Sequence, residues 1–314
     1  MRRPNLFIVG IAKSATTSLY HHLKQHPDIY FPDKDLYPDT LYSLKEPRYF
    51  SHTYHTYPHT GPGDEKIIDR RTIKDLDTYL YYYTKSDGEK YLGDASADNL
   101  YYYETADDIF AFNPDAKIII SLRNPIDRAY SAYAHMRKGF RENLTFEKAL
   151  MEEENRLEKN YEFLWAYKKC GLYYEGVKHY IDVFGRENVH IVLFDDMKSD
   201  IKRVLGNICS FLQIEAYPFP DTDRIHNKSN APKIGIKTTV YKTLFVDRGL
   251  SNRIVKKLFS KETRRRIQLR YEQGKQETIK KSTEEYLLDY YREDIEKLQE
   301  LLGIDLSRWL RRAE

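Results

Sequence analysis

The stretch LFIVGIAKSATTSL, residues 6–19, decides the fold of this chain. Its first four residues are apolar and of strand length, and a turn of small residues with one lysine and several hydroxyls follows before a helix can begin. Such a turn directs the free backbone N–H groups and the dipole of the helix at one anion. The stretch therefore predicts a phosphate cradle at the end of a buried strand, formed by Lys13, Ser14, Ala15, Thr16, Thr17 and Ser18.

The cradle resembles a P-loop in the order of its parts, but it is not a Walker A loop. The fingerprint GxxxxGK[ST] requires a glycine directly before the lysine, where this chain has Ala12. An ordinary strand-to-helix turn, with Ser14 or Thr16 as the helix N-cap, would have a similar sequence. The rest of the chain has to decide between these two interpretations.

Other apolar runs of strand length predict a sheet around this turn. Lys117 to Leu122 and Val189 to Phe194 lie between helical patterns, and Tyr91 to Ala95 is a shorter candidate. Strands that are apolar on both faces are typical of the centre of a parallel sheet. We expect an α/β fold, a P-loop-like doubly wound parallel sheet with its ligand at the carboxyl ends of the strands. The helices expected to flank it are Thr16 to Gln25, Ile73 to Tyr83, Ile126 to Lys138, Phe146 to Lys159, Tyr173 to Phe184, Ile201 to Leu212 and Glu284 to Leu302.

The composition predicts one domain over residues 1–314. The chain is 41% hydrophobic, which suffices for one large core, and no Pro/Gly/Ser-rich linker divides it. It contains no apolar run of about eighteen residues and no signal-peptide pattern, so a cytoplasmic location is expected. Cys170 and Cys209 have no metal-ligand spacing, and we expect both to be buried thiols.

A second candidate phosphate site follows the strand at Lys117 to Leu122. Arg123 lies at the carboxyl end of this strand, and Ser131 follows about two helical turns later. A guanidinium can hold a phosphate with two hydrogen bonds, and a serine hydroxyl adds another donor. In the alternative interpretation, Arg123 pairs with a carboxylate and Ser131 only packs its helix.

A third motif is KEPRYF, Lys45 to Phe50. Its proline disfavours a helical backbone at Glu46, so the carboxylate is presented from an extended segment. Glu46 could equally be a surface acid paired with Lys45 or Arg48.

Together these motifs resemble the sulfotransferase family that uses 3′-phosphoadenosine 5′-phosphosulfate, in particular its carbohydrate branch of heparan sulfate type. GIAKSATTSL resembles the family's 5′-phosphosulfate loop, with Lys13 at the catalytic lysine, and RNPIDRAYS resembles its 3′-phosphate motif, with Arg123 and Ser131 as ligands. KEPRYF resembles the segment that carries the catalytic glutamate, here Glu46. GDAS, residues 93–96, resembles a Gly-Glu-x-Ser motif near the acceptor, with Asp94 in place of the glutamate. The resemblance covers nearly the whole chain.

The resemblance implies transfer of a sulfuryl group by in-line displacement, with adenosine 3′,5′-bisphosphate as the leaving product. Lys13 would stabilise the charge on the leaving phosphate, and Glu46 would take the proton of the acceptor. An ordinary carboxylate is a weak base, so we expect burial or a like-charged neighbour such as Asp94 to raise the pKa of Glu46. The expected acceptor is a hydroxyl or amine of a carbohydrate or glycolipid, with a small-molecule or polyketide alcohol as the alternative. Neither a metal ion nor a nucleic-acid partner is expected.

One residue of the loop departs from the family pattern, and three histidines compete with Glu46 as the base. The family loop usually has glycine where this chain has Ala15, which does not easily adopt a positive φ. The loop is expected to bind phosphate still if its backbone there is helical. The cytosolic branch uses a histidine as the base, but we expect the histidines after KEPRYF to be surface or loop residues; they are His52, His55 and His59.

The nucleotide lid of the eukaryotic heparan enzymes, held by a disulfide, has no cysteine pair to match it here. HNKSNAP, residues 226–232, resembles a segment just before that lid and makes Lys228 a candidate nucleotide contact. The stretch from Arg248 to Arg270 holds nine Lys/Arg and one acid. Its centre, residues 256–266, would cover the 3′-phosphate, attract an anionic acceptor, or form a solvated helix face.

Two other function classes stay open. A nucleotide kinase would have a similar fold and cradle, but it needs ligands for Mg²⁺ and the second loop glycine. A non-catalytic glycan-binding protein would keep the fold without needing Lys13 and Glu46.

Overall fold

The computed structural model describes residues 2–220, 260, 263 and 278–311, and within them one parallel sheet organises the chain. Its five strands lie in the order β2-β3-β1-β4-β5. All the strand pairs are parallel. The strands are β1 (Leu6–Gly10), β2 (Ile29–Tyr30), β3 (Tyr91–Asp94), β4 (Lys117–Leu122) and β5 (Val189–Leu193).

Helices and short 3₁₀ turns connect the strands, so the predicted α/β class is confirmed. The α-helices are α1 (Thr16–Leu23), α2 (Asp64–Ile67), α3 (Leu76–Tyr81), α4 (Thr105–Phe112), α5 (Pro125–Lys138), α6 (Phe146–Met151), α7 (Glu153–Glu158), α8 (Tyr174–Phe184), α9 (Phe194–Ser199), α10 (Ile201–Leu212) and α14 (Lys281–Leu302). The 3₁₀ turns are η1 (Ser51–Tyr54), η2 (Asp69–Arg71), η3 (Phe163–Trp165), η4 (Lys169–Gly171), η5 (Arg186–Asn188) and η7 (Ser307–Leu310).

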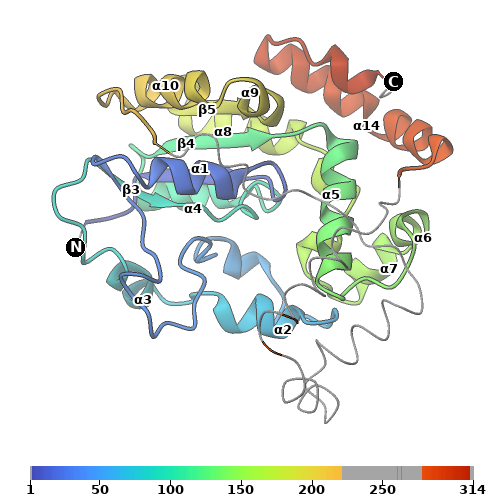
Figure 1. Ribbon diagram of the computed structural model, residues 1–314, viewed down its shortest axis with the longest axis horizontal. Helices are drawn as coiled ribbons and strands as arrows, with labels where there is room; N and C mark the ends of the chain where they lie inside the picture. Colours follow the sequence, from blue (N-terminus) through green and yellow to red (C-terminus); the bar gives the residue numbers. More distant parts are fainter. Residues whose placement is uncertain (1, 221–259, 261–262, 264–277, 312–314) are drawn as a thin grey trace.

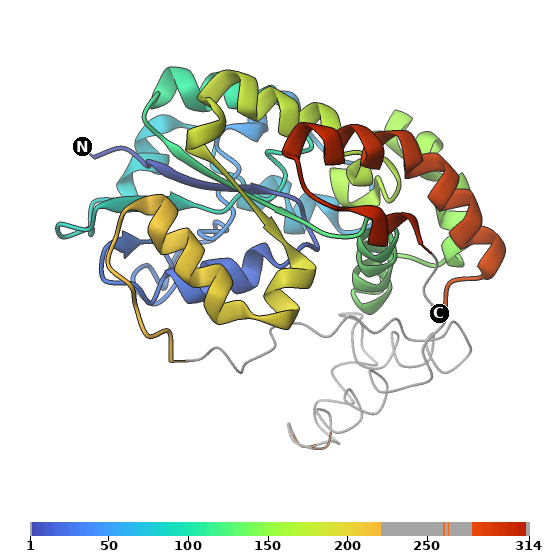
Figure 2. The same ribbon diagram turned by 90° about the horizontal axis from the view of Figure 1, so that it is seen from above.

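The central strand β1 is buried on both faces, as its apolar sequence predicts. Leu6 and Ile8 face a core formed with α1, α9 and α10. Phe7 and Val9 face a second core formed with α4, α5, α8 and α14. Figure 2 shows these two layers, with α1, α9 and α10 on one side of the strands and α4 and α8 on the other.

Helix ends follow local chemistry, and one predicted helix is divided. The side chain of Asn124 accepts hydrogen bonds from the backbone N–H groups of Ile126 and Asp127, which caps α5 with Pro125 in its first turn. The helix predicted from Phe146 to Lys159 is instead two helices, α6 and α7, that meet at Glu152. The helix predicted from Ile73 to Tyr83 is shorter, because Asp75 caps α3 and α3 begins at Leu76.

The segment between β2 and β3 positions the KEPRYF motif. It carries α2 and α3, which lie in Figure 1 at the edge of the molecule opposite α9 and α10. The N–H of Ala95 donates to the carbonyl of Lys45 at 3.2 Å, and the N–H of Ile73 donates to the carbonyl of Pro47 at 2.9 Å. These bonds hold the motif beside the carboxyl end of β3.

Both cysteines are free and buried, as predicted. None of the helices in the described part of the chain is long and apolar enough to cross a membrane. Among the same residues, no group of three or more His, Cys, Asp or Glu side chains is arranged to hold a metal ion.

Candidate functional site

A cavity of about 660 Å³ opens at the carboxyl ends of β1 and β4. Its lining residues come from the turn after β1, the segment 43–71, the second half of α5 and the starts of η3 and α9. They are Ala12, Lys13, Ala15, Thr16, Thr17, Ser18, Ser43, Glu46, Arg48, Ile67, Ile68, Arg71, Arg123, Ala134, His135, Lys138, Gly139, Arg141, Phe163, Leu164 and Phe194. The cavity therefore brings the three motifs of the sequence together.

The turn after β1 is fixed from behind by β4. The N–H of Ile11 donates to the carbonyl of Ser121 at 2.8 Å, and the hydroxyl of Ser121 donates to the carbonyl of Ser14. Helix α1 then begins at Thr16, with Ala15 as an N-cap that offers no side-chain hydrogen bond. The N-cap of Ser14 or Thr16 that the alternative interpretation requires is therefore not found. The first N–H groups of α1 keep no side-chain cap, which suits a bound anion.

The backbone of this turn differs from the expectation at Ala15. Ala15 has φ 69° and ψ 17°, the left-handed region, and Lys13 has φ 77°. Ala15 thus adopts the positive φ that an alanine was not expected to adopt easily, and the helical condition for this loop is not met. A non-glycine residue in this region costs about 1–2 kcal/mol. The bonds to β4 hold the turn in place despite this cost.

Lys13 and Arg123 place two cations on one side of the cavity. Burial, followed by the charge of Arg123, lowers the pKa of Lys13 to about 8. The guanidinium of Arg123 donates to the carbonyl of Lys13 at 3.3 Å and lies 4.4 Å from the centre of the Phe194 ring. Its buried Nε has no hydrogen-bond partner. Among the described residues no carboxylate lies within ion-pair distance of Arg123, which disfavours the alternative in which it is paired.

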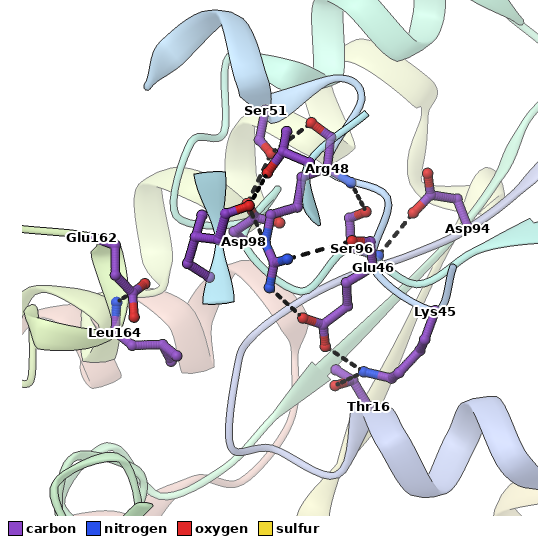
Figure 3. Close-up of polar contacts among 12 residues, drawn as sticks. Thr16, Lys45, Glu46, Arg48, Ser51, Asp94, Ser96, Asp98, Glu162 and Leu164 are labelled. Carbon is purple, nitrogen blue, oxygen red and sulfur yellow. Dashed lines mark hydrogen bonds and ion pairs between the residues drawn. The ribbon is translucent and has the colours of Figure 1, made fainter. Parts of the chain in front are cut away.

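Glu46 faces these cations from the segment that follows β2, and its carboxylate is held at both oxygens. Lys45 Nζ lies 2.5 Å from Oε1, and a guanidinium nitrogen of Arg48 lies 2.7 Å from Oε2 (Figure 3). Burial alone would raise the pKa of Glu46, but the charges of Lys45 and Arg48 outweigh it and lower the pKa. The two interpretations of Glu46 are thus both met, since it is paired and also lines the cavity.

The expected effect of Asp94 on Glu46 is wrong. Its carboxylate accepts from the Tyr79 hydroxyl and the Ser96 N–H, both at 2.8 Å, and burial raises the pKa of Asp94 to about 6. Asp94 does not line the cavity. Asp98, rather than Asp94, is the carboxylate that acts on the pKa of Glu46, and Lys45 and Arg48 outweigh it.

The remaining predicted phosphate ligands lie at different depths. Thr16, Thr17 and Ser18 line the cavity, whereas Ser14 is buried behind the turn. Ser131 is buried on α5 and does not line the cavity. Lys228 and the basic stretch at 256–266 lie outside the continuously described residues.

The histidines after KEPRYF are more enclosed than the sequence suggests. His55 is 8% exposed and lies 3.4 Å from a carboxylate oxygen of Asp98, and burial lowers its pKa. His59 is buried and lies 2.6 Å from Asp69. Both are loop residues, as expected, but they are buried and not on the surface. His55, His59 and His52 do not line the cavity, so Glu46 is the one base candidate named from the sequence that does.

Sequence reasoning missed several cavity residues. His135 lines the cavity, and its pKa is lowered to about 4 by burial and by the charges of Lys13 and Arg141. It lies one helical turn after Ser131, so the helical period of α5 could have indicated it. Phe194 follows β5 as Arg123 follows β4, which is the signal that could have placed it at the same edge.

Comparisons of the sequence and of the structure with known proteins both match sulfotransferases. The model of the sulfotransferase family matches residues 4–218. A solved sulfotransferase from Alicyclobacillus acidocaldarius is 34% identical, with a TM-score of 0.76 over 99% of this chain and 100% of that chain.

Two curated relatives carry acceptor names. Carbohydrate sulfotransferase 15 of Rattus norvegicus is 22% identical over 259 residues, which is 67% of this chain and 44% of that protein. The human bifunctional heparan sulfate N-deacetylase/N-sulfotransferase 1 is 32% identical over 137 residues, 43% of this chain and 13% of that protein. The chain thus matches less than half the length of either.

Proposed function

The chain belongs to the sulfotransferase family, and from this premise we propose that it transfers a sulfuryl group from 3′-phosphoadenosine 5′-phosphosulfate to a carbohydrate hydroxyl or amine. The observation that carries the proposal is the cavity at the carboxyl ends of β1 and β4. Two partly buried cations, Lys13 and Arg123, lie on its donor side, and the carboxylate of Glu46 faces them.

The donor fits the residues present. Lys13 has a pKa of about 8 because burial and Arg123 disfavour its charge, so a bound anion would be favourable there. The buried Nε of Arg123 has no partner, and α1 has no side-chain cap at its N-terminus. The 5′-phosphosulfate would bind Lys13 and the hydroxyls of Thr16, Thr17 and Ser18. Arg123 would hold the 3′-phosphate, and Ser131 and Lys228 remain candidates for the same group.

The proposed chemistry divides between two sides of the cavity. The donor supplies the sulfuryl group, and adenosine 3′,5′-bisphosphate is the product. As the acceptor oxygen forms its bond to sulfur, the bond to the bridging oxygen breaks and its electron pair stays on the leaving phosphate. Lys13 stabilises that charge, and Glu46 accepts the acceptor proton. Removal of one such preorganised donor typically costs about 10²–10³ in rate.

The carbohydrate acceptor is supported by the names of the curated relatives and by further polar residues in the lining of the cavity. Ser43, Arg71 and Lys138 are among them and can bind hydroxyl or anionic groups. The alternative acceptor is a small-molecule or polyketide alcohol.

The test is transfer of ³⁵S-labelled sulfate from the donor to a panel that contains desulfated glycosaminoglycans, glycolipids and simple alcohols. Glu46→Gln keeps the size of the side chain but removes the basic site, so transfer should fall by about 10² or more while adenosine 3′,5′-bisphosphate still binds. Glu65→Gln is a matched control, because Glu65 is exposed on α2 and pairs with Arg70 outside the cavity.

Other outcomes separate the competing functions. Nucleotide binding without transfer to any acceptor would favour a non-catalytic binding protein. Transfer of a phosphoryl group from ATP in the presence of Mg²⁺ would favour a kinase. Normal transfer by Glu46→Gln would overturn the assignment of Glu46 as the base.

A further inference from the structure

The two oxygens of the Glu46 carboxylate have different surroundings. Oε1 contacts Lys45 Nζ, and the same ammonium lies 3.4 Å from Oγ1 of Thr16 at the start of α1. Oε2 contacts the guanidinium of Arg48 instead. Figure 3 shows this order, with Glu46 between Arg48 on one side and Lys45 and Thr16 on the other. Oε1 therefore faces the donor loop, and Oε2 faces away from it.

Arg48 is fixed more firmly than Lys45. It is 5% exposed, and its Nε lies 3.5 Å from Oδ2 of Asp98, which also accepts from the Ser51 hydroxyl at 2.8 Å. The N–H of Arg48 donates to the Ser96 hydroxyl at 3.0 Å, and its backbone is left-handed with φ 55°. The side chain and the backbone of Arg48 are thus both anchored to the segment after β3. The Lys45 ammonium, in contrast, contacts Glu46 and Thr16.

We propose that Arg48 is a positioning residue that holds Oε2 of Glu46, so that Oε1 is the oxygen that accepts the acceptor proton, and that Lys45 occupies the place of the acceptor group until it binds. This inference rests on the proposed sulfuryl transfer. An acceptor that attacks sulfur held at the donor loop has to lie between that loop and the base, and Oε1 is the oxygen on that side.

The proton step is balanced without any further group. Lys45 leaves Oε1 with its own proton, and the acceptor hydroxyl or amine donates its hydrogen bond to the freed oxygen. As the acceptor's electron pair forms the bond to sulfur, its proton moves to Oε1 and Glu46 becomes neutral. Arg48 stays on Oε2 throughout and keeps the carboxyl group in place.

Several charged groups set the pKa of Glu46. Lys45 and Arg48 come from its own segment, and Asp98 comes from the segment after β3. Lys13 reaches it from the donor loop and His135 from α5. Removal of Lys45 or of Arg48 therefore raises the pKa of Glu46, because each removes an opposite charge beside the carboxylate. The two cations therefore have similar effects on the pKa of Glu46, and they differ in that Arg48 alone is proposed to hold the carboxylate in position.

The experiment compares Arg48→Met with Lys45→Met through pH profiles of kcat and kcat/KM in the full chain. Both variants should move the acid limb to higher pH by about one unit or more. On the alkaline plateau, where Glu46 is ionised in every variant, Arg48→Met should lose about 10²-fold in kcat because the base is misplaced. Lys45→Met should lose less than about tenfold there. Arg48→Lys should recover part of the loss.

Controls separate this inference from folding and from the proposed function. Arg70→Met removes an exposed cation that pairs with Glu65 outside the cavity, and its profile should match the wild type. Because Arg48→Met leaves Asp98 buried without its guanidinium, Arg48→Met/Asp98→Asn is the second variant, and it should show the same plateau loss. Calorimetric binding of adenosine 3′,5′-bisphosphate should stay within about twofold of wild type in each variant.

The outcomes are distinct. The positioning role of Arg48 would be overturned if the wild type is active and Arg48→Met and its double variant lose no more kcat on the plateau than Lys45→Met. If the acid limb of the pH profile shifts in neither Arg48→Met nor Lys45→Met, the two ion pairs proposed for Glu46 would be overturned. A wild-type protein that binds the nucleotide but transfers no sulfate would instead contradict the proposed function. Titration of the ¹³C-labelled Glu46 carboxyl by NMR, assigned with Glu46→Gln, gives the pKa change without any activity.

Discussion

Binding of adenosine 3′,5′-bisphosphate should depend on pH through Lys13. Its pKa is about 8 in the free protein, because burial and the charge of Arg123 disfavour the ammonium. Bound phosphates favour the ammonium and raise that pKa. Below pH 8 the lysine is protonated in both states, so the affinity is constant. Above pH 8 binding has to take up a proton, and the affinity falls about tenfold per pH unit until the raised pKa is reached.

From pH 7.5 to 9.5 this linkage predicts a loss of affinity of about 25-fold. The phosphates are ionised over this range, since their second pKa is about 6. Titration calorimetry at fixed ionic strength measures the affinity. At pH 8, two buffers with different ionisation enthalpies should report uptake of about half a proton per nucleotide.

Two variants make the measurement specific. Lys13→Met should bind more weakly at pH 7.5, with an affinity that no longer depends on pH in this range. Lys178→Met removes an exposed lysine of α8 that pairs with Asp182, and it should keep the wild-type slope. A constant wild-type affinity between pH 7.5 and 9.5, or an unchanged slope in Lys13→Met, would refute a Lys13 of lowered pKa that contacts the phosphates.

Three further predictions concern the donor side. With a chelator present, adenosine 3′,5′-bisphosphate should bind more tightly than 5′-AMP in calorimetry, and Arg123→Met should remove the difference; equal wild-type affinities would contradict a 3′-phosphate site at Arg123. In steady-state kinetics, Lys13→Ala should lower turnover at least about tenfold and donor affinity by less, because the leaving oxygen gains charge only in the transition state; normal turnover would mean that Lys13 only shapes the turn. In urea denaturation, Ala15→Gly should raise the free energy of unfolding by up to about 1 kcal/mol, because relief of the left-handed alanine exceeds the extra chain entropy of glycine. A clear loss of stability would show that φ 69° at Ala15 carries no such cost.

The sequence predicts the core of the fold because the segments that form this core have strong local patterns of apolar residues. β1, β4 and α10 are short, strongly apolar or strongly periodic segments, and the predicted bounds of β4 and α10 are those of the structure. β2 has two residues, so no pattern could mark it. The division of α6 from α7 at Glu152 lies within a good helical pattern. Long-range packing decides such boundaries, and packing is not visible in a local window.

The sequence predicts the parts of the candidate site that follow the ends of strands. It does not predict the contacts of the segment between β2 and β3, which packs against residues that are distant in the sequence. Lys13 and Arg123 follow adjacent parallel strands, so they had to lie at one edge. The surroundings of Glu46 depend on a hydrogen bond between the N–H of Ala95 and the carbonyl of Lys45. These two residues are far apart in the sequence, so no local pattern indicates that they meet. Asp94 was expected to raise the pKa of Glu46, whereas Asp98 is the carboxylate with that effect. One domain and a cytoplasmic location stay predictions.

The charges of the cavity explain why a paired, low-pKa glutamate is compatible with a role as base. A free Glu46 of raised pKa would be protonated over part of the physiological range and would then donate rather than accept. Lys45 and Arg48 keep it ionised, at the cost of basicity. Lys45 also contacts Thr16 at the start of α1, so the ammonium that lowers the pKa of Glu46 lies between the base and the donor loop. The order of the two cations along KEPRYF thus places Lys45 on the donor side of Glu46 and Arg48 on the other side.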